Sequence, residues 1–170
     1  MRSAQMLAGS LLAAIAPLGP SQAHGDDRSV REHVTMVAKI ASGFMALAGS
    51  DENAVALVES LREGAPVQLT YPAAHPDDLP KVIAIDVPTH PMDWSDVRMA
   101  LMLTRDSLAA VGVLRPSGEL LHAALMGGDA VVPSGRVVAF KGVLQMRADG
   151  FNWGRIASER YQRPAVARIE

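Results

Sequence analysis

The stretch SDENAVALVESLREGAPVQLTY, residues 50–71, changes its hydrophobic period across one glycine. Before Gly64, apolar residues such as Leu57 and Leu61 recur at three- and four-residue steps, which predicts one face of a helix. After the glycine, apolar and polar residues alternate up to Tyr71, which predicts a strand. Because a helical and a strand period follow one another so closely, the stretch predicts an α+β fold.

Similar patterns continue on both sides of this stretch. Upstream, a helix is expected from Val30 to Gly49, after a polar segment, His24 to Ser29, that we expect to be frayed. Downstream, the expected elements are a strand at 81–87, a helix started by Asp93 or Ser95, a short helix started by Ser117, a hairpin turning at 133–135, and two short helices broken at Gly150. We therefore predict an α+β fold of two α-α-β-β halves with short antiparallel strands and a final helical pair.

The two predicted halves also align with each other. A shift of 64 positions superposes core residues of a helix, its glycine stop and the entry to a strand, namely Leu57 on Leu121, Leu61 on Leu125, Gly64 on Gly128 and Val67 on Val131. An internal duplication over about 30–91 and 94–160 would produce this alignment. Coincidence is the alternative, because amphipathic helices that end at glycine are common.

Both tryptophans stand in the same local pattern, in HPMDWSDVRM (90–99) and in DGFNWGRIAS (149–158). In each copy an apolar residue and a short Asx residue precede the tryptophan, and a β-branched apolar residue follows three positions later. Asp93 and Asn152 have side chains that cap helices. The pattern predicts two helix starts at which buried tryptophans anchor their helices to one core.

The first 23 residues have the pattern of a secretory signal peptide. One cation, Arg2, precedes an uncharged stretch whose apolar core, Leu7 to Ala16, is shorter than the ~20 residues that span a bilayer. Small residues suit cleavage after Ala23. We therefore expect a single mature domain, residues 24–170, in the periplasm or secreted, with no membrane span after processing.

The composition narrows the function classes. The chain has 16 Lys and Arg against 18 Asp and Glu, a net charge of −2, and no cysteine. A weakly acidic chain has no general attraction for nucleic acid, so nucleic acid is not an expected partner. The lack of cysteine excludes a thiol nucleophile and a thiolate metal site. No cofactor is expected, because the chain lacks a glycine-rich phosphate cradle between a strand and a helix.

Two proline-rich loops flank the second predicted strand and contain the candidate binding residues. Long loops on a rigid scaffold often carry function. We therefore expect a ligand or partner to bind at Tyr71, His75, Asp77, Asp78 and His90. The hydrolase motifs G-x-S-x-G and H-E-x-x-H are missing, so no catalytic residue is assigned and an enzyme is the less favoured class.

Three methionines allow two interpretations. Met36, Met92 and Met99 are expected to fill the core, with an adaptable apolar surface as the alternative.

The histidines support an alternative function, a periplasmic metal-binding protein. Cleavage after Ala23 would make His24 the first residue, whose amine and imidazole can chelate a copper-like ion if another histidine approaches. His75 and His90, each followed by proline, are the candidate partners. Against a metal site, no two histidines have a ligand spacing such as i, i+4.

A third interpretation is a helix-turn-helix DNA-binding protein, with the motif at Asp149 to Glu159. A helix, a glycine turn and a second helix match the order of that motif. DNA recognition requires basic residues at the start of the second helix, whereas the segment supplies one cation there, Arg155. Two short helices that pack a tryptophan into the core are the favoured interpretation.

Three segments, residues 42–69, 92–128 and 142–157, resemble a group of uncharacterised exported (signal-peptide-bearing) bacterial proteins. That group shares a helix–glycine–strand block, a Pro-capped short helix ending in Gly-Gly, and a late Gly-x-x-Trp-Gly-x-Ile-Ala segment. The long loop YPAAHPDDLPK departs from the group's pattern. The resemblance implies an exported domain and supplies no activity. We therefore expect an exported, non-enzymatic, envelope-associated binding or structural module with an unknown envelope or protein partner.

Overall fold

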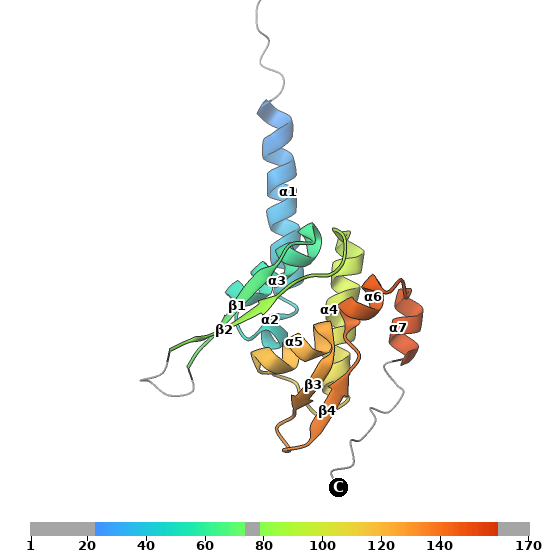
Figure 1. Ribbon diagram of the computed structural model, residues 1–170. Helices are drawn as coiled ribbons and strands as arrows, with labels where there is room; N and C mark the ends of the chain where they lie inside the picture. Colours follow the sequence, from blue (N-terminus) through green and yellow to red (C-terminus); the bar gives the residue numbers. More distant parts are fainter. Residues whose placement is uncertain (1–22, 74–78, 160–170) are drawn as a thin grey trace, which may run out of the picture.

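The computed structural model describes residues 23–73 and 79–159, in which seven helices accompany two antiparallel two-stranded sheets (Figure 1). The elements are, in chain order, α1 (Ala23–Ala41), α2 (Met45–Ala48), α3 (Asp51–Glu63), β1 (Val67–Tyr71), β2 (Lys81–Ile85), α4 (Trp94–Ala109), α5 (Gly118–Met126), β3 (Gly128–Val131), β4 (Val137–Phe140), α6 (Val143–Ala148) and α7 (Trp153–Glu159). The predicted α+β class is confirmed, because each hairpin follows a group of helices and a helical pair ends the described chain.

The first helix starts earlier than the sequence suggested. α1 begins at Ala23, so its first turns are helical where fraying was expected. Charged pairs at i, i+4 spacing support these turns: Arg28 Nε lies 3.1 Å from Glu32, and Arg31 Nη2 lies 3.8 Å from Asp27. The polar N-terminal part of α1 is therefore helical, and pairs of opposite charge one turn apart support it.

The predicted helix up to Gly49 is interrupted near its end. The amides of Gly43 and Phe44 donate to the carbonyls of Ile40 and Ala41, three residues earlier, so the chain tightens into a turn. α2 follows and ends at Gly49, whose φ of 90° is readily adopted only by glycine. The turn places the Phe44 ring in the core, where it is 6% exposed.

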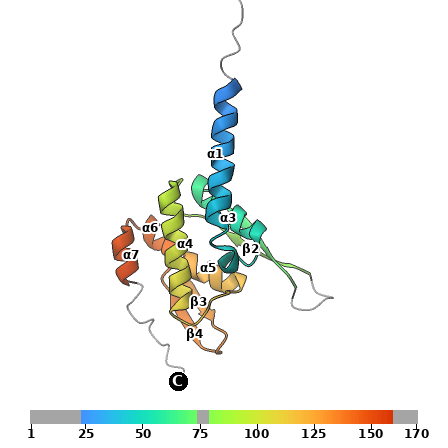
Figure 2. The ribbon, with the colours of Figure 1, turned by 180° about the vertical axis from the view of Figure 1, so that it is seen from behind.

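α5 lies at the centre of the molecule. It contacts α4, α6 and both hairpins, while α3 packs against α1, β1 and α4. α1 projects from this body, and Figures 1 and 2 both show its N-terminal half standing clear of the other helices and strands. None of the helices described is long and apolar enough to cross a membrane.

The first hairpin pairs Val67 with Ile85 and protects its outer edge. The buried side chain of Asn53 donates to the Thr70 carbonyl at 2.9 Å and accepts from the Thr70 amide at 2.9 Å. One amide side chain thus makes the two bonds that a further strand would make there. Strand addition at this point of β1 is therefore blocked from within the chain.

The aligned positions of the two halves share burial in their helices but not in their strands. The four aligned leucines are each at most 1% exposed, and they are Leu57, Leu61, Leu121 and Leu125. Val67 is buried at the entry to β1, whereas Val131 in β3 is 62% exposed. The two halves are therefore similar in the burial of their aligned helical leucines, and they differ in the burial of their aligned strand residues.

Candidate functional site

Tyr71, a predicted binding residue, ends β1 with its ring packed between two glycines. Cβ atoms at Gly49 and Gly118 would come within 2.8 Å and 2.6 Å of the ring, so larger residues do not fit beside it. The hydroxyl is enclosed and has no hydrogen-bond partner among residues 23–73 and 79–159. Burial raises the pKa of Tyr71 to about 12. The ring therefore serves as packing between α2, β1 and α5.

The other predicted loop residues lie only partly within the described chain. His90 is exposed in the segment between β2 and α4. His75, Asp77 and Asp78 lie outside the described residues, and for His24 only the backbone, in the first turn of α1, is described. The described part of the chain contains no group of three His, Asp or Glu side chains placed to hold a metal ion. Binding by these loops stays a prediction.

The two short helices expected on either side of Gly150 are present: α6 ends just before the segment Asp149 to Glu159, and α7 lies within it. The start of α7 is joined to α4, because Trp153 Nε1 donates to Asp96 Oδ1 at 2.6 Å. The cation of this turn, Arg155, pairs with Glu159 at 3.1 Å. The first turn of α7, where a DNA-binding motif would read bases, is thus engaged with the protein itself.

Both tryptophans begin a helix, as the sequence predicts. The Asp93 carboxylate accepts from the Asp96 amide at 2.8 Å, and the Asn152 side chain accepts from the Arg155 amide at 2.8 Å. These contacts satisfy amides that have no partner within the helix. Both indoles pack against the core as predicted, but each is only partly buried, with one ring face covered by an arginine.

We call the first of these arrangements the Trp94 cluster, formed by Arg62, Met92 and Trp94. Arg62 Cζ lies 5.1 Å from the indole centre, within the range of a cation–π contact. Arg62 Nη1 also donates to the Met92 carbonyl at 2.7 Å. The Met92 amide donates at 3.3 Å to the carbonyl of Leu61, the residue before the arginine. The end of α3 therefore holds the chain that enters α4.

The Trp153 cluster, formed by Arg147, Phe151 and Trp153, has the same geometry. Arg147 Cζ lies 4.8 Å from the indole centre, and its Nη1 donates to the Phe151 carbonyl at 3.2 Å. The Phe151 amide donates at 3.0 Å to the carbonyl of Met146, again the residue before the arginine. Here the arginine comes from the last turn of α6, not from a helix before a hairpin. The geometry therefore recurs on elements that the 64-residue shift does not superpose.

The second contact of each indole differs between the clusters. Trp153 donates to Asp96, whose other carboxylate oxygen lies 3.4 Å from Arg147 Nη2. Trp94 instead meets the imidazole of His33 on α1, with ring centres 5.2 Å apart. Trp153 is thus joined to the body by a hydrogen bond, whereas Trp94 lies at the end of a groove.

This groove, of about 480 Å³, lies between α1 and α4, and we call it the α1–α4 groove. Its α1 side, with the turn that follows the helix, is lined by Met36, Lys39, Ile40, Gly43 and Phe44. Its α4 side is lined by Trp94, Ser95, Arg98, Met102 and Arg105. Figures 1 and 2 show the C-terminal part of α1 beside α4 from opposite sides.

The floor of the α1–α4 groove is apolar and fixed to the core. Ile40 and Phe44 are buried, and Met36 and Met102 are partly buried against the core. Met36 thus lines a surface, while Met92, from the same set of methionines, fills the core. Because these side chains rest on the core, the floor exists before any ligand arrives.

The rim of the α1–α4 groove is basic. It carries Lys39 from α1 and Arg98 and Arg105 from α4, and none of its lining residues is acidic. Arg105 lies over the Phe44 ring at 5.6 Å, with its Nε 3.7 Å from Asp106. Lys39 and Arg98 are exposed and form no salt bridge within the described residues. The rim is therefore locally positive on a chain whose net charge is −2.

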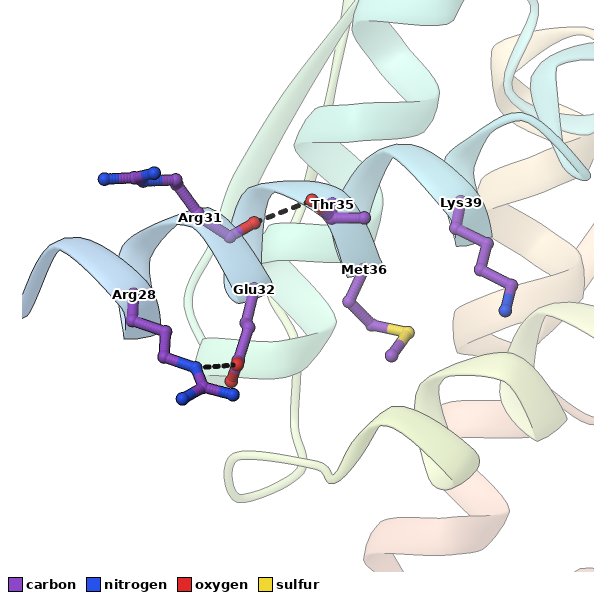
Figure 3. A pocket seen from close by; sticks show the side chains of 6 residues that line it. All are labelled: Arg28, Arg31, Glu32, Thr35, Met36 and Lys39. Carbon is purple, nitrogen blue, oxygen red and sulfur yellow. Dashed lines mark hydrogen bonds and ion pairs between the residues drawn. The ribbon is translucent and has the colours of Figure 1, made fainter. Parts of the chain in front are cut away.

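A second, more open hollow of about 640 Å³ continues along α1 (Figure 3). Arg28, Glu32, Met36 and Lys39 project from one side of the helix in Figure 3, and Arg28 donates to Glu32 at 3.1 Å. Every residue that lines this hollow comes from α1. It is therefore a helix face that extends the α1–α4 groove, not a separate site.

Sequence reasoning did not find the α1–α4 groove, although part of its signal is visible. Arg98, Met102 and Arg105 recur at four- and three-residue steps, which places them on one face of the predicted helix. That face borders the core face of the helix, where Val97 and Leu101 are both fully buried. Nothing in the sequence indicates that α1 lies beside this face.

Comparison with protein-family models, with curated proteins and with solved structures gives no match to this chain. The function is therefore argued from the geometry of the site.

Proposed function

We propose that this protein is a non-enzymatic binding module that holds its partner along the α1–α4 groove. The observation that carries the proposal is the combination of an apolar floor with three cations and no acid on the lining, in a chain of net charge −2. On the surface of a weakly acidic protein, three cations around an apolar floor are not expected by chance. Such a surface attracts a partner that is both apolar and negatively charged.

The size and rigidity of the α1–α4 groove support this use. Its volume of about 480 Å³ lies within the roughly 300–1,000 Å³ typical of ligand sites. Both of its walls pack on α3, so they are held relative to each other by the core. Binding then costs little ordering of the protein, which favours affinity.

We also propose that the module is exported and acts in the cell envelope, in the periplasm or outside the cell. The support is the charge, apolar core and small residues of the first 23 positions. We further propose that the chain arose by internal duplication, supported by the equal burial of the four aligned leucines. Fractionation of cells that express the chain tests export, which predicts a processed form outside the cytoplasm.

No geometric observation in the described residues favours the other two functions. A metal site would require His75 and the side chain of His24, which the structure does not describe, to approach His90. A DNA-binding role would require a free first turn on α7, whose Trp153 and Arg155 are engaged within the protein. The α1–α4 groove is therefore the site on which the proposal rests.

The two tryptophans allow a direct test of the α1–α4 groove. Because Trp94 lines it and Trp153 does not, Trp153→Phe leaves one emitter at the site. We expect the apolar anion 8-anilinonaphthalene-1-sulfonate to bind this variant at one saturable site and to accept energy from Trp94. Met102→Glu should abolish the transfer, because it places an anion on the floor. Saturable transfer that is unchanged by Met102→Glu, or no binding at all, would overturn the proposal.

A further inference from the structure

We propose that the occupant of the α1–α4 groove is an acidic amphipathic helix of a partner protein. This inference rests on the proposed binding function and names the chemistry of the partner. Four features of the groove support this inference: its length, its apolar floor, the cations on both walls, and the absence of a covering element among the residues that line it.

The α1–α4 groove has the length of about three helical turns. At one end His33 meets Trp94, and at the other Arg105 lies over Phe44. The same number of residues separates these two contacts on each wall, so the walls run in the same direction. At a rise of about 1.5 Å per residue, the α4 wall between the contacts extends for roughly 16 Å. A helix of about 12 residues presents an apolar stripe of that length.

The floor of the groove suits such a stripe. Met36 and Ile40 are one turn apart on α1, and Met102 faces them from α4. Methionine side chains adapt to the shape of an incoming apolar surface. A helix in a groove is anchored by residues at i, i+3, i+4 and i+7, which this floor can receive in succession.

The cations on both walls define the flanks of the partner helix. Lys39 stands on the α1 wall and Arg98 on the α4 wall, both exposed and without a salt bridge within the part of the chain that is described. A helix lying between them would therefore place acidic residues on both sides of its apolar stripe. A basic or uncharged helix would leave the two cations without compensation.

An extended acyl chain is a less suitable occupant. Small-ligand sites bury 70–90% or more of the ligand surface, which requires walls on nearly every side. The α1–α4 groove is lined by α1, the turn that follows it and α4, and no other described element contributes a lining residue. A partner that exposes its own polar face to solvent fits this opening, and an amphipathic helix has such a face.

The test uses the full chain carrying Trp153→Phe, and three synthetic 14-residue peptides. The first has leucines at helical spacing flanked by glutamates, the second has lysines in place of the glutamates, and the third is the glutamate peptide with two central prolines. Titrations that follow Trp94 emission should give a micromolar Kd for the glutamate peptide. Binding of the lysine and proline peptides should be at least about tenfold weaker, because they lack the charge and the helix respectively.

Variants of the protein then locate the contact. Arg98→Glu and Lys39→Glu should each weaken binding of the glutamate peptide about tenfold and reduce its dependence on salt. Arg136→Glu, an exposed residue in the second hairpin, makes the same charge change away from the groove and should leave binding unchanged.

Three results would overturn the inference. Equal binding of the glutamate and lysine peptides would remove the charge argument, and equal binding of the proline peptide would remove the helix. Palmitate binding that depends on Arg98, without peptide binding, would identify an anionic lipid as the occupant. Retained dye binding in the groove would show in each case that the binding function stands while the helical partner fails.

Discussion

The Trp94 and Trp153 clusters are built from the same contacts but have different tasks. In both, an Asx residue caps a helix that starts at tryptophan, and an arginine covers the indole and binds the carbonyl two residues before it. The arginine reaches Trp94 from α3, across the first hairpin, and reaches Trp153 from the adjacent α6. The recurrence therefore reflects a stable way to enter a helix, more than one copied unit.

The second contact of each indole explains why the two clusters have different roles. The indole N–H of Trp153 donates a hydrogen bond to Asp96, which joins α7 to α4. Trp94 instead contacts His33 on α1 and lines the α1–α4 groove. One cluster thus joins α7 to the body and the other lies at the end of the α1–α4 groove, and four predictions test this distinction.

The largest effect is expected for Trp153→Ala. This change removes the packing of α7 and leaves Asp96 with Arg147 as its partner. Since the indole is half-buried, we expect a loss of about 2–3 kcal/mol in the free energy of unfolding, below the value for a fully buried tryptophan. Urea denaturation followed by circular dichroism measures it. A cost no greater than that of Trp94→Ala would mean that the Asp96 contact does not distinguish the clusters.

Phenylalanine at each position separates packing from hydrogen bonding. Trp153→Phe keeps an aromatic ring but loses the bond to a carboxylate, which should cost about 1–2 kcal/mol. Trp94→Phe should cost less than about 1 kcal/mol, because the indole N–H of Trp94 forms no hydrogen bond within the described chain. The same denaturation experiment compares the two, and equal costs would contradict the assignment.

Double-mutant cycles test whether the two arginine contacts are equivalent. Alanine substitutions of Arg62 with Trp94, and of Arg147 with Trp153, should each give a coupling energy of about 0.5–1 kcal/mol, as partly exposed cation–π pairs do. A measurable coupling energy in only one cluster would show that the two arginine contacts are not energetically equivalent despite their similar geometry.

The smallest effect concerns pH, because one cap titrates and the other does not. Hydrogen bonds from the Asp96 amide and the Ser95 hydroxyl lower the pKa of Asp93. A lowered folded-state pKa adds stability above the ordinary aspartate pKa of about 3.9, and this stability is lost as the pH falls through the lowered value. Asp93→Asn keeps the cap and should reduce the fall in denaturation midpoint between pH 7 and pH 3.

The matched change at the other cap is Asn152→Asp. It should introduce a similar acid-dependent loss at α7, because the new carboxylate would accept from the Arg155 amide. Other acidic groups titrate alike in parent and variant, so the difference between their pH profiles reports the cap. An unchanged profile in both variants would mean that neither cap contributes through its charge.

Much of the fold follows from local patterns in the sequence. Asp93 and Ser117 cap helices where predicted, and the hairpin turn after Val131 is found as expected. The split between α1 and α2 was not predicted, because the apolar spacing continues through Gly43 while the backbone turns. The loops chosen as the candidate binding site lie partly outside the described residues, so that choice stays a prediction, and the α1–α4 groove was not predicted.

The sequence by itself determined the periods, caps and glycine stops of this protein, because these depend on neighbours within about one turn of helix or one strand. Tertiary structure decided which surfaces meet. Arg62 finds Trp94 thirty-two positions away, Trp153 finds Asp96, and α1 comes to lie beside α4 over α3. Each of these contacts requires long-range packing of elements whose own patterns do not specify a partner. The α1–α4 groove is therefore a property of the folded chain, although every residue that lines it has an ordinary place in a helix or turn.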